Sequence, residues 1–211
     1  MPALRTRMEQ SHRLRWYGSV TLMESKLDKK QLRKAMQQRR AALSTEEQQR
    51  RSLQITKQLF QSALYDKNIR ICIYQAFRNE VSCDTIMYES WKCGKEVFVP
   101  VTDEQNKTME FYKVTEQTQW RLGAYGIMEP VLEAAAKPLT EPALILMPGL
   151  VFDRDKHRIG YGGGYYDKYL AVHPIHVTAA LCYDFQIVSE DLPYEEHDIL
   201  PDYIITEDAI F

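Results

Sequence analysis

The pattern that most limits the fold of this chain is an alternation of strand-like and helix-like segments after residue 70. Apolar or alternating stretches typical of strands fall at residues 70–77, 96–102, 109–114, 143–152, 177–183 and 203–206. Helical patterns fall between them, at residues 82–93 and 164–172. Because parallel strands need crossover helices, the alternation predicts one α/β domain with a mainly parallel sheet and helices on both faces.

Two helices are predicted ahead of this alternating part. Residues 25–43 carry an apolar stripe at helical spacing, formed by Leu32, Ala35, Met36 and Leu43. The segment from Ser44 to Glu47 is typical of a capping box, which would open a second helix to about residue 62. The short link between the two helices predicts an N-terminal helical hairpin.

Three cations, Lys29, Arg33 and Arg40, lie along one border of that stripe. Residues 1–51 hold 13 Lys and Arg against 5 Asp and Glu, although the formal net charge of the whole chain is −2. Such a concentration indicates an anionic ligand, which could be a phosphate, a nucleic acid or a membrane surface. A solvated basic helix face is the alternative, but the border position of the cations favours an anion site.

The composition excludes two classes of protein. The 13 Tyr, 7 Phe and 3 Trp supply too much apolar area for a mainly disordered chain. No uncharged apolar run reaches the roughly 18 residues that would predict a membrane span. No Cys-x-x-Cys pair occurs among the four cysteines, Cys72, Cys83, Cys93 and Cys182. We therefore predict buried, reduced thiols and a cytoplasmic location, and we predict no zinc site.

Residues 1–22 stand apart from the rest of the chain. They contain four arginines and one acidic residue, and no apolar core of signal-peptide length follows them. An organellar transit peptide is one interpretation. We favour an N-terminal extension without ordered structure, ahead of a single domain over residues 23–211.

The most informative stretch is a glycine loop between the apolar run 143–152 and the helix predicted at 164–172. Four of the nine glycines stand at positions 160 and 162–164, where backbone N–H groups could approach an anion at a helix N-terminus. The stretch matches neither the Walker A nor the dinucleotide-binding pattern, and a tight strand-to-helix turn is the alternative. Arg158 could pair with phosphate oxygens and Asp167 could hold a divalent metal ion, so we favour a phosphate site.

The segment from Arg158 to Asp167, Arg-Ile-Gly-Tyr-Gly-Gly-Gly-Tyr-Tyr-Asp, resembles the signature of the 5-formyltetrahydrofolate cyclo-ligase (5,10-methenyltetrahydrofolate synthetase) family. Four further segments resemble the same family in the same order along the chain: residues 29–33, 125–130, 148–153 and 193–202. One short match could arise by chance, whereas the ordered set is specific and covers nearly the whole chain from about Met23.

The resemblance implies a three-layer α/β/α sandwich and a set of site residues. By matching position, ATP would be bound by Lys29, Lys30, Gln31, Leu32, Arg33, Arg158, Ile159, Gly160, Tyr161, Gly162, Gly163, Gly164, Tyr165 and Tyr166. The folate would be bound by Gln75, Glu80, Tyr161, Gly162, Gly163, Gly164 and Tyr165. Asp167 and Asp198 would hold the metal ion, and Lys29 and Arg158 would be catalytic.

The implied reaction is the ATP- and Mg²⁺-dependent cyclisation of 5-formyltetrahydrofolate to 5,10-methenyltetrahydrofolate, with release of ADP and phosphate. The formyl oxygen is a poor leaving group, and transfer of the ATP γ-phosphoryl group to it would give an N5-iminium phosphate that N10 attacks. Such a reaction needs positioning and positive charge more than covalent help from the protein. A carboxylate such as that of Glu80 suits the paired N–H donors of a pterin.

Three positions depart from the family pattern. Lys156 stands where glycine is usual, Cys83 stands where threonine is common, and Gln75 stands where an apolar residue is more usual. The turn before Arg158 and the contact with the pterin are the features these departures would affect.

Two other functions are weighed against the cyclo-ligase. One is a nucleic-acid-binding protein that uses the basic N-terminus. The other is a phosphate enzyme of a related α/β fold, such as a sugar-phosphate isomerase, that uses the glycine loop without ATP. We expect the partners to be ATP and 5-formyltetrahydrofolate, with no nucleic acid and no membrane, and we expect a monomer.

Overall fold

A six-strand sheet, in the order β10-β9-β6-β1-β2-β3, forms the centre of the protein, whose computed structural model describes residues 28–123 and 126–211. Its strands are β1 Arg70–Cys72, β2 Glu96–Asp103, β3 Thr108–Val114, β6 Leu144–Met147, β9 Val177–Leu181 and β10 Tyr203–Ile205. Neighbouring strands are parallel except for β2 and β3, which are antiparallel at one edge. The predicted mainly parallel sheet is confirmed.

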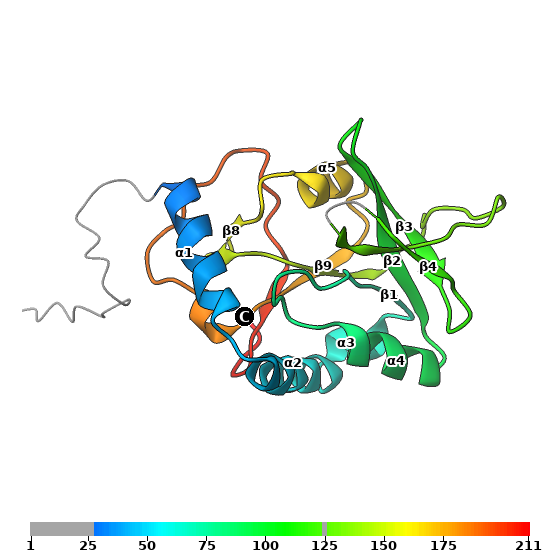
Figure 1. Cartoon of the computed structure of the whole chain (residues 1–211), viewed down its shortest axis with the longest axis horizontal. Coiled ribbons are helices and arrows are strands. Elements are labelled where there is room, and N and C mark those ends of the chain that lie inside the picture. The colour runs from blue at the N-terminus through cyan, green and yellow to red at the C-terminus, as the bar shows by residue number, and fades with distance from the viewer. Residues whose placement is uncertain (1–27, 124–125) are drawn as a thin grey trace, which may run out of the picture.

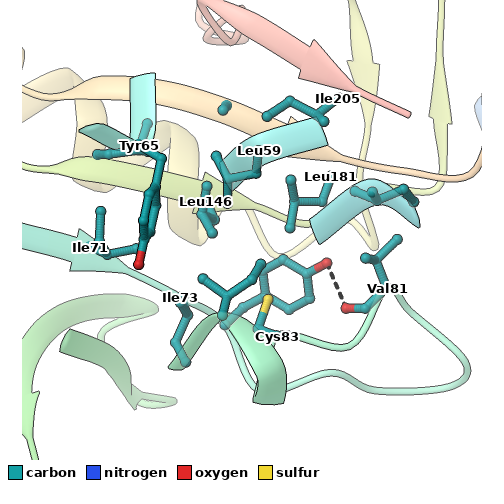
Figure 2. Packing of buried hydrophobic residues seen from close by; sticks show 14 of the residues in the cluster. Leu59, Tyr65, Ile71, Ile73, Val81, Cys83, Leu146, Leu181 and Ile205 are labelled. Atoms are coloured by element: carbon teal, nitrogen blue, oxygen red, sulfur yellow. Dashed lines mark hydrogen bonds between the residues drawn. The ribbon is translucent and has the colours of Figure 1, made fainter. Parts of the chain in front are cut away.

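Helices cover both faces of this sheet (Figure 1). One face carries α2 Thr45–Phe60, α3 Ala63–Lys67 and α4 Asp84–Lys92, and the other carries α5 Tyr165–Val172. Because successive strand residues point to opposite faces, Leu144 and Leu146 of β6 pack under the first group, while Ile145 packs with α5. Figure 2 shows the first cluster, in which Leu59 and Tyr65 lie against the strands. The three-layer sandwich is confirmed.

Two N-terminal helices are present, as predicted. The first, α1, spans Lys29–Ala41, and its N-cap Asp28 accepts a hydrogen bond from the Lys30 amide. Ser44 caps α2 by accepting a hydrogen bond from the Glu47 amide at 3.1 Å. The two helices run in different directions (Figure 1), and their buried residues enter different clusters. They therefore diverge from the short link instead of packing side by side as a closed hairpin.

The buried face of α1 differs from the predicted stripe. Met36 is buried and Leu32 is half-buried, and both pack on the cluster that contains Val151. Ala35, which was predicted to belong to the stripe, is exposed, whereas the Arg40 side chain is 1% exposed. The buried face is therefore turned toward Arg40, because polar partners inside the protein take up its guanidinium group.

Two strand predictions were too long. The segment 70–77 pairs as a strand only to Cys72, and beyond Ile73, whose amide donates to the Phe98 carbonyl, it leaves the sheet. The run 143–152 is two strands, β6 and β7 Val151–Phe152, because the chain turns sharply at Pro148–Leu150. A Cβ atom on Gly149 would lie 2.2 Å from the Phe152 ring, so only glycine fits this turn. Strand β7 pairs with β8 Arg158–Ile159, which leads into the glycine loop.

Several short elements escaped the sequence analysis. They are α3, the antiparallel pair β4 Trp120–Leu122 and β5 Met128–Pro130, and the 3₁₀ helix η2 Asp184–Gln186. All four cysteines are free thiols, and Cys93 is exposed rather than buried. No helix within the two described ranges is long and apolar enough to cross a membrane. The predicted extension 1–22 and residues 25–27 of the first predicted helix lie outside those ranges.

Candidate active site

A cavity of about 740 Å³ lies beyond the carboxyl ends of the central strands. The segment after β1 contributes Tyr74, Gln75, Phe77 and Glu80 to its lining, and the turn after β6 contributes Pro148. Ligands of open α/β sheets bind at this position, because the strand order reverses there and leaves a crevice. The cavity is within the range of about 300–1,000 Å³ typical of small-molecule sites.

The glycine loop, residues 160–164, forms one wall of this cavity. Gly162 and Gly164 have φ angles of +100° and +67°, a backbone conformation that favours glycine. Gly164 is also the N-cap of α5, so the loop delivers backbone N–H groups and the helix N-terminus to the cavity. Arg33 of α1 fixes the loop, because its Nε donates to the Gly160 carbonyl at 2.8 Å.

Two ion pairs lie in the cavity wall beside the loop. Arg158 Nη2 lies 2.9 Å from Asp167 Oδ1, and Lys29 Nζ lies 3.3 Å from Asp198 Oδ2 and 3.0 Å from Glu195 Oε1. Burial acts to lower the pKa of Lys29, but hydrogen bonds to the two carboxylates raise it overall. Burial acts to raise the pKa of Asp198, but hydrogen bonds from the Glu195 amide and Lys29 lower it overall. Both residues are therefore charged at neutral pH.

Two buried polar atoms of residues that line the cavity lack a hydrogen-bond partner among the described residues. They are Arg158 Nε and the Tyr166 hydroxyl. Burying an unpaired donor costs free energy, so such atoms usually have a partner from outside the chain. Both residues belong to the cavity lining, although neither of these two atoms is itself exposed.

The segment after β1 also lines the cavity and carries Glu80. This side chain is 5% exposed and accepts a hydrogen bond from the Phe77 amide at 2.9 Å. Burial raises the pKa of Glu80 to about 7, against the opposing charge of Arg40. Arg40 Nη1 lies 3.6 Å from Glu80 Oε1, and Arg40 Nη2 donates to the Tyr161 hydroxyl of the glycine loop.

The cavity brings together most of the residues predicted to bind ligands. Its lining includes the following of them: Lys29, Arg33, Gln75, Glu80, Arg158, Ile159, Gly160, Tyr161, Gly162, Gly163, Gly164, Tyr165, Tyr166, Asp167 and Asp198. Three residues predicted to bind ATP are not in its lining. Lys30 and Gln31 are exposed, and Leu32 packs on the cluster beneath α1.

Sequence reasoning missed several residues of the site. Arg40 was noted as a border cation but not as a site residue, and its burial has no local sequence signal. Arg78, Glu129, Glu195 and His197 line the cavity. Glu129 belongs to the segment 125–130 that resembles the family, and its Oε1 accepts a hydrogen bond from Thr102 Oγ1 at 3.0 Å. That resemblance was the one available signal for Glu129; Tyr125 of the same segment lies outside the described residues.

The three departures from the family pattern have distinct surroundings. Lys156 has a φ angle of +70°, which glycine adopts at lower cost, and its Nζ donates to the Asp202 carbonyl. Cys83 is buried at the start of α4 and makes no side-chain capping bond there. Gln75 is half-buried and lines the cavity.

The donor set of the cavity suits a magnesium ion held partly by a phosphate ligand. No group of three or more side chains able to hold a metal ion occurs in the described part of the chain. Mg²⁺ commonly takes one or two carboxylates and completes its shell with water and phosphate oxygens. Asp167 and Asp198 both line the cavity, and Asp167 accepts a hydrogen bond from the amide of Ile199, the residue after Asp198.

The mainly parallel sheet, with its cavity at the strand ends, defines an α/β enzyme. The sequence profile of the 5-formyltetrahydrofolate cyclo-ligase family matches residues 25–207. The chain is 32% identical to mouse 5-formyltetrahydrofolate cyclo-ligase over 197 residues, which cover 86% of this chain and 94% of the relative. The chain belongs to the 5-formyltetrahydrofolate cyclo-ligase family and converts 5-formyltetrahydrofolate to 5,10-methenyltetrahydrofolate.

Other relatives agree with this assignment. The cyclo-ligase of Escherichia coli K12 is 27% identical over 180 residues, covering 83% of this chain and 98% of the relative. The NMR structure of Aquifex aeolicus 5,10-methenyltetrahydrofolate synthetase has a TM-score of 0.73 at 30% identity, covering 86% of this chain and 91% of that one. A synthetase from Mycoplasma pneumoniae has a TM-score of 0.67 at 23% identity, covering 86% and 100%, and supports the fold alone.

Family membership decides among the three functions that the sequence left open. It favours the ligase over the isomerase-like and the nucleic-acid-binding alternatives, and it implies a folate substrate and ATP. The monomeric state and the cytoplasmic location stay predictions.

Proposed function

We propose that the cavity binds ATP and the folate side by side, so that the terminal phosphate meets the formyl oxygen. One observation carries this proposal: a single cavity is lined by the glycine loop and three cations and also by Glu80 and Gln75. The group made of Lys29, Arg33, Arg158 and residues 160–164 is called the phosphate end. The segment of residues 74–80 is called the folate end.

The chemistry explains why both ends are needed. The γ-phosphoryl group moves from ATP to the formyl oxygen and leaves ADP behind, which turns that oxygen into part of a good leaving group. N10 then attacks the formyl carbon, the carbon–oxygen bond breaks, and phosphate departs with the oxygen while the N10 proton goes to phosphate or solvent. The protein aligns the two ligands and offsets the negative charge of the phosphates.

At the phosphate end, binding would exchange the partners of the two ion pairs. Lys29 and Arg158 now face Asp198 and Asp167. With nucleotide present, the two cations would turn to phosphate oxygens, and the unpartnered Arg158 Nε would gain an acceptor. The two aspartates would then hold Mg²⁺, which would offset the charge that develops on the transferred group. Charge would stay balanced in both states, so neither sign would be left buried and unpaired.

At the folate end, the Glu80 carboxylate would accept hydrogen bonds from the pterin. A charged acceptor strengthens such bonds, and the buried position excludes competing water. Gln75 would add an amide contact from the same segment. Tyr161 to Tyr165 would close the site between the two ligands, since Tyr161 also contacts Arg40, the ion-pair partner of Glu80.

An absorbance assay tests the activity and its requirements. Wild-type protein with ATP, Mg²⁺ and 5-formyltetrahydrofolate should form the methenyl product, seen as a rise in near-ultraviolet absorbance. Omission of either ATP or Mg²⁺ should abolish the rise. A rise of equal rate without nucleotide would contradict the proposed role of ATP.

Two adjacent lysines test the phosphate end. Lys29→Met should weaken ATP binding and leave folate binding nearly unchanged, because Lys29 belongs to the proposed phosphate end of the cavity. Lys30→Met is the matched control, since Lys30 is exposed and outside the cavity lining. Binding constants for each ligand alone would be measured by calorimetry. Equal losses for the two variants would contradict the assignment of Lys29.

A further inference from the structure

Arg40 is the most deeply buried cation of the site region, and the mechanism above does not use it. Its side chain is 1% exposed although it lies in the last turn of a helix. Its Nε has no hydrogen-bond partner in the described ranges. An apolar side chain of similar size would avoid the cost of burying this group, so its presence calls for a role other than packing.

The guanidinium group reaches three separate segments of the site. Nη1 donates to the Gly149 carbonyl in the turn after β6, and Nη2 donates to the Phe77 carbonyl at the folate end, both at 3.4 Å. Nη2 also donates to the Tyr161 hydroxyl, in the glycine loop. The same group forms the ion pair with Glu80. The folate end also meets the loop through the rings of Phe77 and Tyr161, whose centroids lie 6.2 Å apart, and Arg40 adds hydrogen bonds to both segments.

The backbone around Arg40 adds a second connection to the folate end. The side chain of Asn79 donates to the Arg40 carbonyl at 3.1 Å and to the Leu43 carbonyl at 3.4 Å. Asn79 and Arg78 have φ angles of +56° and +49°, a conformation that costs free energy for arginine and less for asparagine. Strained backbone of this kind persists where surrounding contacts hold it, and here the end of α1 supplies them.

Helix α1 thus holds the glycine loop at two points, two turns apart. Arg33 binds the Gly160 carbonyl and Arg40 binds the Tyr161 hydroxyl, while Met36 between them packs in one cluster with Ile159. We propose that Arg40 is a positioning residue that joins the glycine loop to the Glu80 segment, and so sets the phosphate end relative to the folate end. The inference rests on the proposed function, because it takes Glu80 as the folate ligand.

The ionisable groups around Glu80 leave Arg40 as its main charged partner. The others that influence it are uncharged near neutral pH, since burial raises the pKa of each of them; they are Tyr74, Cys83, Tyr161, Tyr166 and Tyr183. Arg78 lines the cavity nearby and is exposed. Removal of the Arg40 charge would therefore raise the pKa of Glu80 further, and folate binding would need a higher pH.

Two substitutions separate the geometry of Arg40 from its charge. Arg40→Lys keeps the charge but cannot reach all the acceptors of the planar guanidinium group. It should lower kcat/KM for 5-formyltetrahydrofolate by about 100-fold through both a higher KM and a lower kcat, with little change in ATP affinity. Arg40→Gln should in addition shift the pH dependence of folate affinity to higher pH. Arg39→Lys, the same change one residue earlier on an exposed side chain, is the control.

A purely structural role would give a different result. Activity would then fall only with the fraction of folded enzyme, seen by thermal unfolding, while KM for folate and its pH profile stayed as in the wild type; that outcome overturns the proposal. An equal loss of ATP affinity and folate affinity in Arg40→Lys would also overturn the proposal. A double variant of Arg40→Lys with Tyr161→Phe should lose less than the sum of the two single variants, because both disturb the contact between Arg40 and the Tyr161 hydroxyl.

Two further variants keep the test decisive. If Arg40→Lys does not fold, Asn79→Gly removes the side-chain bonds to α1 while easing the strained φ angle, and it should raise KM for folate without weakening ATP. An unchanged KM in that variant would then overturn the proposal. Glu80→Gln distinguishes a failure of the proposed function from a failure of the Arg40 proposal. Unchanged folate affinity in Glu80→Gln contradicts the proposed function itself. Weakened folate affinity in Glu80→Gln, together with wild-type behaviour of folded Arg40→Lys, contradicts only the role of Arg40.

Discussion

The phosphate end and the folate end of the cavity differ in how their charged side chains are paired. At the phosphate end, Lys29 and Arg158 are paired with carboxylates that are themselves able to bind a metal ion. At the folate end, Glu80 is nearly excluded from solvent, and its charged partner Arg40 is buried with it. The first arrangement can exchange partners when a charged ligand enters, and the second is fixed before any ligand arrives.

This difference suits the two ligands. A triphosphate with its metal ion brings both signs of charge, so it can replace existing pairs without leaving a charge unpaired. A pterin brings a rigid, neutral edge of hydrogen-bond donors, which a preformed carboxylate binds with little reorganisation. Substitutions at the two ends should therefore differ in size and in their dependence on pH and salt.

The largest effect is expected at Arg158. Arg158→Ala removes a cation from the phosphate end and leaves Asp167 without its ion-pair partner. We expect kcat/KM for ATP to fall about 100- to 1,000-fold, as when a preorganised donor is lost from a reacting centre. Steady-state kinetics with each substrate varied in turn would measure it. Arg154→Ala, at an exposed position of the preceding turn, should behave as wild type. If Arg158→Ala lost folate affinity as strongly as ATP affinity, the assignment of Arg158 to the phosphate end alone would be contradicted.

The next effect concerns stability at the folate end. The pKa of Glu80 is about 7 in the folded protein, against an ordinary value of 4.5. The unfolded chain releases this proton at lower pH than the folded chain, so the Glu80 contribution to stability falls as pH rises from about 4.5 to 7. Glu80→Gln removes this loss and should be more stable than wild type by about 3 kcal/mol at pH 8, relative to their difference at pH 5.

Thermal or urea unfolding at the two pH values measures this difference. Glu116→Gln, at an exposed position, should show no such dependence on pH. If the stability difference between Glu80→Gln and wild type is the same at pH 5 and pH 8, burial does not raise the pKa of Glu80 in the folded protein. The contrast between the two ends would then lose its basis.

A smaller effect is expected in the turn that leads to the glycine loop. Lys156 adopts a φ angle of +70°, and replacing it with glycine should stabilise the fold by about 1 kcal/mol, less the loss of its exposed bond to Asp202. Activity should not change, because Lys156 does not line the described cavity. Lys137→Gly, at an exposed residue without a positive φ angle, should instead lose stability. Equal losses for both variants would mean that the turn carries no strain.

The smallest effect is expected at Glu195. This residue would compete with a bound phosphate for Lys29, but its side chain is 60% exposed, so its ion pair is worth under about 1 kcal/mol. Glu195→Gln should bind ATP a few-fold more tightly at low salt, and the gain should vanish at high salt. Glu196→Gln, its exposed neighbour, is the control. Weaker ATP binding by Glu195→Gln would mean that this carboxylate takes part in binding.

The two ends also differ in how far sequence could predict them. The glycine loop is a local pattern between a strand and a helix, so its position beside α5 followed from spacing alone. The pairing of Arg40 with Glu80 joins residues 40 positions apart, and a buried arginine in a polar helix has no local signal. Ala35 was predicted to be buried in its place because helical periodicity counts apolar residues and cannot see polar partners in the tertiary structure.

Strand lengths failed for a related reason. The segment 70–77 has strand-like composition throughout, but it pairs only to Cys72, because the chain must leave the sheet to form the folate end. The run 143–152 is uniformly apolar, yet Gly149 breaks it where the Phe152 ring requires a position without a Cβ atom. Both segments lie beside the cavity, where the backbone path that forms the site overrides the local propensity for strand.

The central claim is that one cavity holds both ligands with the terminal phosphate at the formyl oxygen. A crystal structure with Mg²⁺, a non-hydrolysable ATP analogue and 5-formyltetrahydrofolate tests it most directly. We predict that the phosphates lie between Lys29, Arg158 and the glycine loop, and that the pterin contacts Glu80. A nucleotide bound away from this loop, or a pterin remote from Glu80, would contradict the claim.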